Sequence, residues 1–259
     1  MSENIYVIGN WKMNKHLHEV TDFFDQFNIS LHDMFASDNS ANIEIGVAPA
    51  AIHLPQLSDA TNFSLVAQNI ASEENGAYTG EISASMVAEY SRYVLVGHSE
   101  RRMFFNESND ILIKKIMLAY KYNLIPIFCF GENLENREKG DYLSIIKQQI
   151  EKVIFPVFSS SVFLNQTLIV AYEPVWAIGT GKHASPEQIS EVHDYARNLL
   201  IDNIGNIKGS VPILYGGSCN SQNAKSILEQ KNVNGLLIGG ASLDVDHFTK
   251  IIQIAHGLS

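Results

Sequence analysis

Short, almost continuous runs of apolar residues recur along the whole chain, and amphipathic segments separate them. A run of this kind is typical of a strand that is buried on both faces, as in a parallel sheet. We therefore expect one strand from each run. The eight runs are IYVIGNW (5–11), IEIGVAP (43–49), FSLVAQN (63–69), YVLVGH (93–98), LIPIFCFG (124–131), TLIVAYEP (167–174), VPILYGGS (211–218) and GLLIGGAS (235–242).

The segments between these runs show the spacing of amphipathic helices, most clearly over 184–200. There Ser185 is a good N-cap, Pro186 suits the first helical position, and Gln188 completes a capping box. The apolar positions that follow lie on one helical face. They are Ile189, Val192, Ala196 and Leu199.

Helices are also predicted at 111–120 and 142–155, whereas the 30s and the 70s are expected to be loops. Eight strand–helix units average about 32 residues each, the size of a βαβ unit. Strict alternation indicates a parallel sheet of the α/β class, and eight units in about 250 residues favour a closed (β/α)8 barrel. An open doubly wound sheet is the alternative. No shift of composition marks a second domain, so we expect residues 1–259 to form one barrel domain.

Composition narrows the kind of partner. The chain has 259 residues, of which 46% are hydrophobic, and this is ample for a large core. A net charge of −10 argues against a general nucleic-acid binder. It does not argue against a small anionic substrate, because one lysine and a few backbone amides suffice to hold a phosphate.

The cysteines and the apolar runs bear on location. Cys129 and Cys219 lie far apart in the sequence, so we expect reduced thiols rather than a disulfide scaffold or a metal site. A secretory signal begins with a positively charged region, but the first eleven residues of this chain contain no Lys or Arg. No apolar run approaches the roughly 18 residues needed to cross a membrane. We expect a soluble cytoplasmic protein.

In a (β/α)8 barrel the functional site lies at the carboxyl ends of the strands. The residues that end five of the predicted strands supply one candidate base, one imidazole, one lysine and two glycine-rich turns. Such turns expose amides that suit a phosphate group. The residues are Asn10, Trp11 and Lys12; Gly97, His98, Ser99 and Glu100; Glu173 and Pro174; Gly216, Gly217 and Ser218; and Gly239 and Gly240.

Each of these features alone has an ordinary structural explanation. A lone glutamate is most often an ion-pair partner, a lone histidine a satisfied core residue, a lone lysine a surface charge, and a Gly-Gly pair a tight turn. Gathered at one end of one barrel, they favour a functional site. The segment GTGKHA (179–184) fits a loose dinucleotide fingerprint, but the next strand ends in YGGS without the acid that would bind a ribose. It is not a P-loop either, because Trp176 and His183 replace required residues.

Several motifs together resemble triosephosphate isomerase, from the first strand to the last helix. AYEPVWAIGTGK (171–182) is the most specific of them. The others are GNWKMN (9–14), QNI and GAYTGE between 68 and 81, GHSERR (97–102), YGGS (215–218) and GGASL (239–243).

The resemblance implies a TIM barrel that interconverts dihydroxyacetone phosphate and glyceraldehyde 3-phosphate without a cofactor or metal. It implies that Glu173 is the catalytic base and His98 the electrophile. Glu100 lies close behind His98 in the sequence, and we expect it to support the site as a lysine partner rather than as a proton relay. Lys12 and Asn10 would bind the substrate. The phosphate would be held near Gly179, Ser218, Gly239 and Gly240.

The resemblance also implies a homodimer, in which the loop of the 70s carries Thr79 into a pocket of the neighbouring subunit. Tyr78 is a candidate anchor, and Glu81 and Arg101 are candidates for an ion pair between subunits. The sequence departs from the usual pattern at Lys15, where glycine is common. It also departs at MFFNES (103–108), where a glycine often precedes the Glu, and at Cys219, where valine is usual.

The chemistry of these residues is consistent with that reading. Moving a carbonyl group by one carbon requires a positioned base for the proton next to it and donors for the enediolate oxygens. Pro174 fixes φ beside Glu173, and Gly179 and Gly181 would let the following loop move, with Trp176 as an apolar anchor. A helix that begins after His98 would favour a neutral imidazole.

Two other functions remain open. A Schiff-base aldolase would need a lysine inside a strand, and none of the eight predicted strands has one before its end. A non-catalytic barrel kept as a binding protein would be expected to have lost Glu173, His98 or Lys12.

Overall fold

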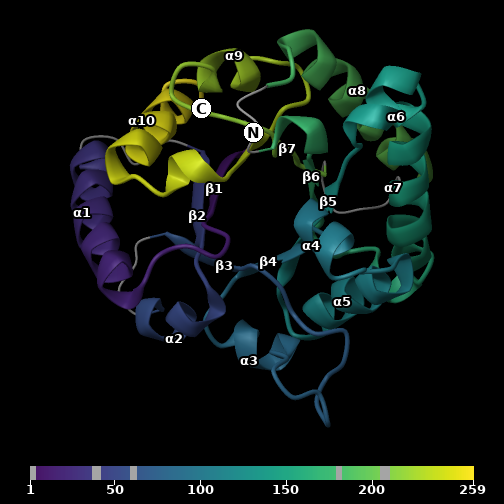
Figure 1. Ribbon diagram of the computed structural model, residues 1–259, viewed down its shortest axis with the longest axis horizontal. Coiled ribbons are helices and arrows are strands. Elements are labelled where there is room, and N and C mark those ends of the chain that lie inside the picture. The colour runs from purple at the N-terminus through teal and green to yellow at the C-terminus, as the bar shows by residue number, and fades with distance from the viewer. Residues whose placement is uncertain (1–3, 37–41, 59–62, 179–182, 205–210) are drawn as a thin grey trace.

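The computed structural model describes residues 4–36, 42–58, 63–178, 183–204 and 211–259. Each strand pairs in parallel with the next in sequence, and β1 pairs with β8, so the sheet closes into a barrel (Figure 1). This confirms the predicted (β/α)8 fold and excludes the open sheet. The strands are β1 (Ile5–Asn10), β2 (Ile43–Ala48), β3 (Ser64–Ala67), β4 (Tyr93–Val96), β5 (Ile125–Phe130), β6 (Ile169–Tyr172), β7 (Ile213–Tyr215) and β8 (Gly235–Ile238).

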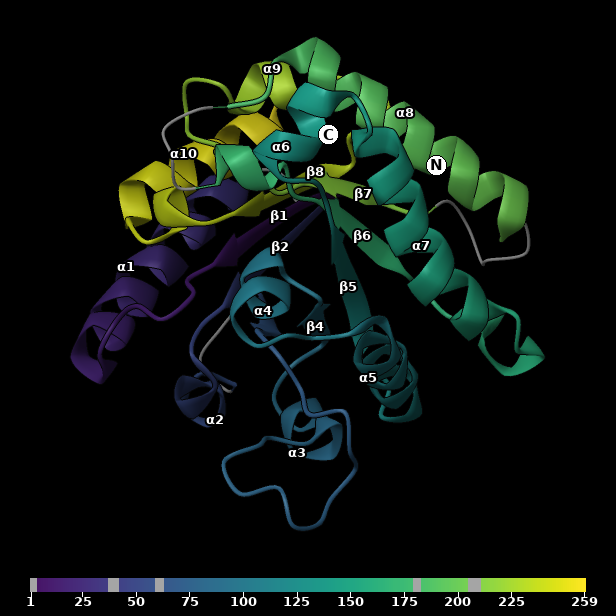
Figure 2. The same cartoon turned by 45° about the vertical axis from the view of Figure 1, so that its right-hand side comes forward.

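The helices surround the strands as an outer layer, which Figures 1 and 2 show from two directions. They are α1 (Leu17–Phe35), α2 (Leu54–Leu57), α3 (Ala84–Ala88), α4 (Ser99–Phe104), α5 (Asn109–Lys121), α6 (Leu134–Lys139), α7 (Tyr142–Phe158), α8 (Pro186–Asn203), α9 (Ala224–Leu228) and α10 (Val245–His256). Short 3-10 turns are η1 (Ala51–His53), η2 (Ser161–Phe163), η3 (Val175–Ala177) and η4 (Gly240–Ser242). None of the described helices is long and apolar enough to cross a membrane.

Alternation along the strands divides the core into two layers, because successive strand residues point to opposite faces. An inner cluster takes at least one side chain from every strand and fills the barrel. A larger outer cluster joins the other strand face to the helices. The inner cluster consists of Ile8, Ala48, Val66, Tyr93, Leu95, Ile127, Cys129, Ile169, Ala171, Leu214 and Leu237.

The strand register brings the carboxyl ends to one rim. The last residue of β1, Asn10, pairs with the last residue of β2, Ala48. Phe130 and Tyr172, which end β5 and β6, pair in the same way. Side chains that follow these strands therefore share one end of the barrel.

Helix α8 begins as its sequence predicts. The Ser185 hydroxyl accepts a hydrogen bond from the Gln188 amide at 3.3 Å, and the Gln188 side chain accepts one from the Ser185 amide at 2.9 Å. This capping box satisfies two amides at the start of the helix.

The prediction of a loop in the 30s is wrong, because α1 continues to Phe35. Its buried residues Phe23, Phe24, Phe27 and Leu31 recur at helical spacing, so the apolar stripe holds the helix on the barrel for a further turn. The prediction for the 70s is confirmed. Residues 68–83, which we call the arm, connect β3 to α3 without a helix or strand and project away from the barrel (Figures 1 and 2).

Candidate active site

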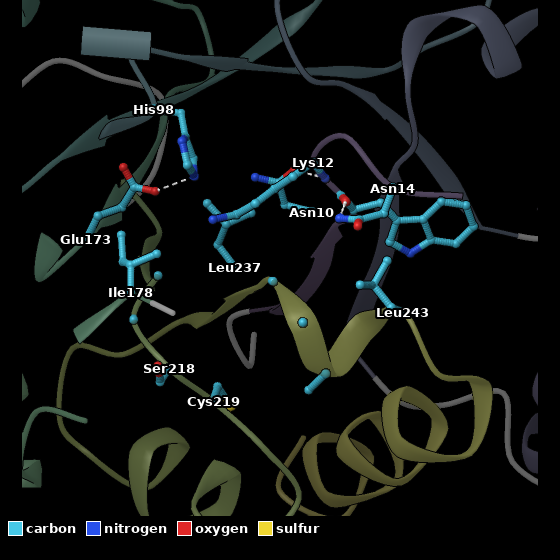
Figure 3. Close-up of a pocket in the computed structure, with 16 residues that line it drawn as sticks. Asn10, Lys12, Asn14, His98, Glu173, Ile178, Ser218, Cys219, Leu237 and Leu243 are labelled. Carbon is cyan, nitrogen blue, oxygen red and sulfur yellow. Dashed lines mark hydrogen bonds and ion pairs between the residues drawn. The ribbon is translucent and has the colours of Figure 1, made fainter. Parts of the chain in front are cut away.

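A cavity of about 390 Å³ opens at the carboxyl ends of the strands. Lys12, His98 and Glu173 all line it, and Figure 3 shows Glu173 and His98 side by side at one end of it. The sequence therefore predicted three groups that share one cavity. The sixteen lining residues are Asn10, Trp11, Lys12, Asn14, His98, Glu173, Ile178, Gly216, Gly217, Ser218, Cys219, Leu237, Gly239, Gly240, Ala241 and Leu243.

The end of β1 places a lysine in this cavity in an uncommon backbone conformation. Lys12 has a φ of 54°, a region that non-glycine residues adopt rarely and that often marks functional sites. Its amide donates to the Asn10 side chain at 3.1 Å, and its carbonyl accepts from Gln68 at 2.9 Å. The Lys12 ammonium lies 2.6 Å from a Glu100 oxygen. The backbone is therefore fixed by its neighbours, and the ammonium has one carboxylate partner.

His98 is the N-cap of α4, as the sequence predicted. The Glu100 amide donates to Nδ1 at 3.2 Å, which makes Nδ1 an acceptor and leaves the proton of a neutral ring on Nε2. Nε2 lies 2.9 Å from a carboxylate oxygen of Glu173 (Figure 3). The imidazole thus presents a donor to the cavity.

Glu173 follows β6 and is almost completely buried, with 1% of its surface exposed. Its second oxygen accepts a hydrogen bond from the Ser99 amide at 2.8 Å. Its own amide donates to the Phe130 carbonyl at 2.7 Å, which extends the β5–β6 pairing by one residue. A Cβ atom at Gly131 would lie 1.7 Å from the Glu173 carbonyl oxygen, so only glycine fits beside this backbone.

Two opposing influences act on the protonation of His98. Burial lowers its pKa, but the charge and contact of Glu173, with a smaller contribution from Glu100, outweigh burial and raise the pKa above 6.5. This direction is opposite to the one expected from the helix start alone. The cause is the position of Glu173, whose carboxylate rests against the ring in the free site.

Glycine-rich turns after β7 and β8 line the same cavity. Gly239 and Gly240 lead into η4, and a Cβ atom at Gly240 would meet nothing within 4 Å, so its backbone faces open space. The Ser218 hydroxyl donates to the Ala177 carbonyl at 2.5 Å. Backbone amides without side chains in front of them suit an anion. Gly179, the remaining predicted phosphate residue, lies outside the described residues, as does Gly181.

Glu132 is a functional candidate that the sequence reasoning missed. One of its oxygens accepts hydrogen bonds from the Trp176 indole at 2.9 Å and from the Tyr172 hydroxyl at 3.0 Å. Its backbone carbonyl accepts from the Val175 amide at 3.0 Å. Burial raises the pKa of Glu132, and these donors act against that rise. A signal was present, since an acid directly follows the fifth predicted strand.

Two of the four residues predicted for subunit contact line a second cavity of about 400 Å³. Glu81 and Arg101 both line it, together with Glu100. Tyr78 is half exposed on the arm and Thr79 is exposed beside it. Within its own chain, Arg101 lies 2.6 Å from Glu107.

The departures from the family pattern have structural consequences. Lys15 adopts a φ of 71°, and its ammonium lies 5.1 Å from the centre of the Trp11 ring. Asn106 takes a φ of 52° at the position where glycine is common. Cys219 lines the first cavity, and burial raises its pKa to about 12, which keeps the thiol neutral. Among the described residues, no three His, Cys, Asp or Glu side chains are placed to hold a metal ion.

Comparison with known proteins gives one consistent result. The chain matches the family Triosephosphate isomerase over residues 5–255. It is 43% identical to the triosephosphate isomerase of Porphyromonas gingivalis over 262 residues, which cover 98% of this chain and 99% of the relative. The triosephosphate isomerase of Bacteroides fragilis is 42% identical over 98% of this chain and 99% of its own length. That of Mycoplasmopsis pulmonis is 39% identical, with 96% and 97% covered.

Proposed function

The chain belongs to the triosephosphate isomerase family, and we infer from this membership and from the cavity that it interconverts dihydroxyacetone phosphate and D-glyceraldehyde 3-phosphate. It is an intramolecular aldose–ketose isomerase, and the reaction is a step of glycolysis and gluconeogenesis. The carbonyl group moves by one carbon through an enediolate. A base, a donor for two oxygens in turn and a phosphate site are the parts that this chemistry needs.

We propose that Glu173 is the base. Its carboxylate rests between the Ser99 amide at 2.8 Å and the His98 ring at 2.9 Å. It takes the proton from the carbon next to the carbonyl group and returns it to the neighbouring carbon. To do so it must exchange these resting contacts for the substrate, and its place on the cavity wall allows a short movement.

His98 acts as the electrophile. The Glu100 amide occupies Nδ1, so the ring donates from Nε2 to the carbonyl oxygen and later to the neighbouring hydroxyl oxygen. When Glu173 turns to the substrate, the influence that raises the pKa of His98 weakens while burial still favours the neutral ring. The movement of the base thus prepares the electrophile.

Lys12 and Asn10 bind the substrate. Lys12 supplies positive charge for the enediolate and the phosphate, and Asn10 supports its backbone at 3.1 Å. Glu100 is a supporting residue that holds the Lys12 ammonium at 2.6 Å. Gly239 and Gly240 offer backbone amides to the phosphate, with Ser218 beside them and Gly179 from the segment that follows η3.

One observation carries this proposal: a buried carboxylate, an imidazole donor and a lysine line a single cavity together with the glycines that follow β7 and β8. An aldolase that works through a Schiff base is disfavoured, because none of the eight strands contains a lysine. A binding protein without activity does not need all three groups.

A coupled assay in both directions tests the function. The purified chain is expected to turn over both trioses, and Glu173→Gln, which keeps the shape and removes the base, is expected to lower kcat by about 10²- to 10⁴-fold. Activity absent from the unaltered chain would reject the isomerase. Near-normal turnover in the variant would assign the proton transfer to another residue.

We further propose that the chain is a single barrel domain and acts as a cytoplasmic homodimer. Both cysteines are free and buried, which suits a reducing compartment. Exposed apolar side chains lie around the second cavity, among them Met13, which is 96% exposed, and Phe105, which is 63% exposed. A second copy would cover them, with Tyr78 and Thr79 of its arm in that cavity and an ion pair between Glu81 and Arg101.

A further inference from the structure

Residues 73 and 74 of the arm form ion pairs with helix α5 of their own subunit. Glu73 lies 3.0 Å from the Lys114 ammonium, and Glu74 lies 2.6 Å from the Lys121 ammonium. The Tyr122 hydroxyl also donates to Glu74, at 2.5 Å. Two consecutive arm residues thus contact lysines about two turns apart on one helix.

The tip of the arm, residues 75–81, takes its shape from its own backbone. Gly76 and Gly80 have φ values of 118° and 95°, which other residues adopt rarely. The Tyr78 amide donates to the Gly76 carbonyl at 2.9 Å, and the Glu81 amide donates to the Tyr78 carbonyl at 3.0 Å. The result is a compact turn that exposes the ring of Tyr78.

A receiving surface lies next to the same arm. The second cavity is lined by Gly80, Glu81 and Ile82 of the arm and by Met13 and Phe105 of the barrel rim. The projecting tip and the cavity are adjacent on one chain, which is the arrangement that a two-fold related pair requires: each copy gives its tip and receives the other. A second copy is therefore the occupant that fits this surface.

We propose that the contacts of Glu73 and Glu74 with α5 preorganise the arm, so that the tip is already in the geometry that a second copy binds. This inference rests on the proposed homodimer and adds the device that controls its affinity. A loop that must be ordered during association reduces the affinity, whereas one held in place beforehand does not. The pairs are exposed, so salt screens them, and their effect on assembly must weaken as ionic strength rises.

The double variant Glu73→Gln with Glu74→Gln tests the proposal. It removes the charge pairs and leaves the tip, the second cavity and the buried core unchanged. The matched control is Glu135→Gln with Glu151→Gln, which removes two charges from exposed pairs with Lys139 and Lys147 on α6 and α7. Both variants change the net charge equally.

The dimer Kd is measured by fluorescence-detected sedimentation at low and high salt. We expect the arm variant to raise the Kd about tenfold at low salt, because a dimer has two arms with two exposed pairs each and every pair contributes about 1.8-fold. At 0.5 M salt, where the Debye length is on the order of 5 Å, the Kd of the variant is expected to approach that of the unaltered chain. The control is expected to keep the Kd of the unaltered chain. The exchanged pair Glu74→Lys with Lys121→Glu is expected to restore part of the affinity lost by Glu74→Gln alone.

The outcomes separate the two proposals. A dimeric unaltered chain whose Kd is the same in the arm variant and in the control would overturn the preorganised arm and leave the homodimer standing. An equal rise in both variants would also overturn it, because the effect would then be one of net charge. An unaltered chain that is monomeric at assay concentrations would overturn both proposals.

Discussion

At the scale of the residue, the position of Glu173 follows from its immediate neighbours. Its amide is bound by Phe130, its carbonyl leaves room only for glycine at position 131, and Pro174 restricts the next φ to −65°. The backbone is thus rigid, while the carboxylate is held by two contacts that a substrate can replace. A base that transfers a proton between two neighbouring carbons needs a fixed backbone and a carboxylate that can change its contacts.

The pKa of His98 offers a prediction at this scale. Burial lowers it and Glu173 raises it, with the second effect larger. Glu173→Gln removes the charge and leaves burial, so the pKa of His98 is expected to fall below that of the unaltered chain in a ¹⁵N NMR titration. Glu100→Gln, the control, is expected to lower it less, because Glu100 contributes less than Glu173.

The same pair affects stability with a definite sign. Because the pKa of folded His98 is raised, the contribution of the His98–Glu173 pair to the free energy of unfolding is fully present below pH 6.5 and is lost as the pH rises through the raised value.

The NMR titration can contradict this account. An unchanged His98 pKa in Glu173→Gln would show that the carboxylate does not control the ring. The proposed preparation of the electrophile by movement of the base would then be wrong.

At the scale of the element, η3 links the base to the rest of the barrel. Trp176 in this turn donates to Glu132, which follows β5 and also binds Tyr172 of β6. Since η3 begins two residues after Glu173, the partners of Glu132 help to keep the end of β6 in place.

Glu132→Ala is expected to destabilise the fold by about 2–4 kcal/mol, because it removes the acceptor of the buried Tyr172 hydroxyl and the contact with the partly buried Trp176 indole. It is also expected to lower kcat by loosening the segment that carries Glu173. Glu132→Gln keeps an acceptor oxygen and should lose less of both. Urea unfolding and the coupled assay measure the two effects, and a stable, fully active Glu132→Ala would show that η3 holds Glu173 without this contact.

Some of these elements could be predicted from the sequence and others could not. The eight strands and the start of α8 follow from local patterns, namely apolar runs and a capping box, and both were predictable. The length of α1 was missed although its apolar residues up to Leu31 recur at helical spacing, and packing of Met34 and Phe35 on the core shows that the helix continues.

The same limit applies to the site. Lys12, His98 and Glu173 end strands, so the barrel topology predicts a common rim. The resting contact between His98 and Glu173, and the fastening of the arm by Lys114 and Lys121, join residues from separate elements. These contacts depend on how the elements pack in three dimensions, and the periodicity of apolar residues along the chain does not predict them.

At the scale of the whole molecule, the barrel separates stability from chemistry. The apolar clusters fill the interior and the layer beneath the helices, while the polar groups to which we assign the reaction lie at one rim. A chain with a net charge of −10 still offers an anion a local site, because glycine amides and Lys12 line the cavity. Overall charge therefore does not predict the charge of the substrate.

The central claim is that Glu173 carries a proton between neighbouring carbons through an enediolate, and isomerisation in deuterium oxide tests it most directly. A carboxylate that holds the proton exchanges it with solvent, so NMR of the product is expected to show deuterium on the carbon next to the carbonyl group in at least part of the molecules. Glu173→Gln should form this product more slowly by about the same 10²- to 10⁴-fold as its loss of kcat. If the unaltered chain forms product at its full rate with no deuterium at that carbon, the result would indicate direct hydride transfer and would contradict the account.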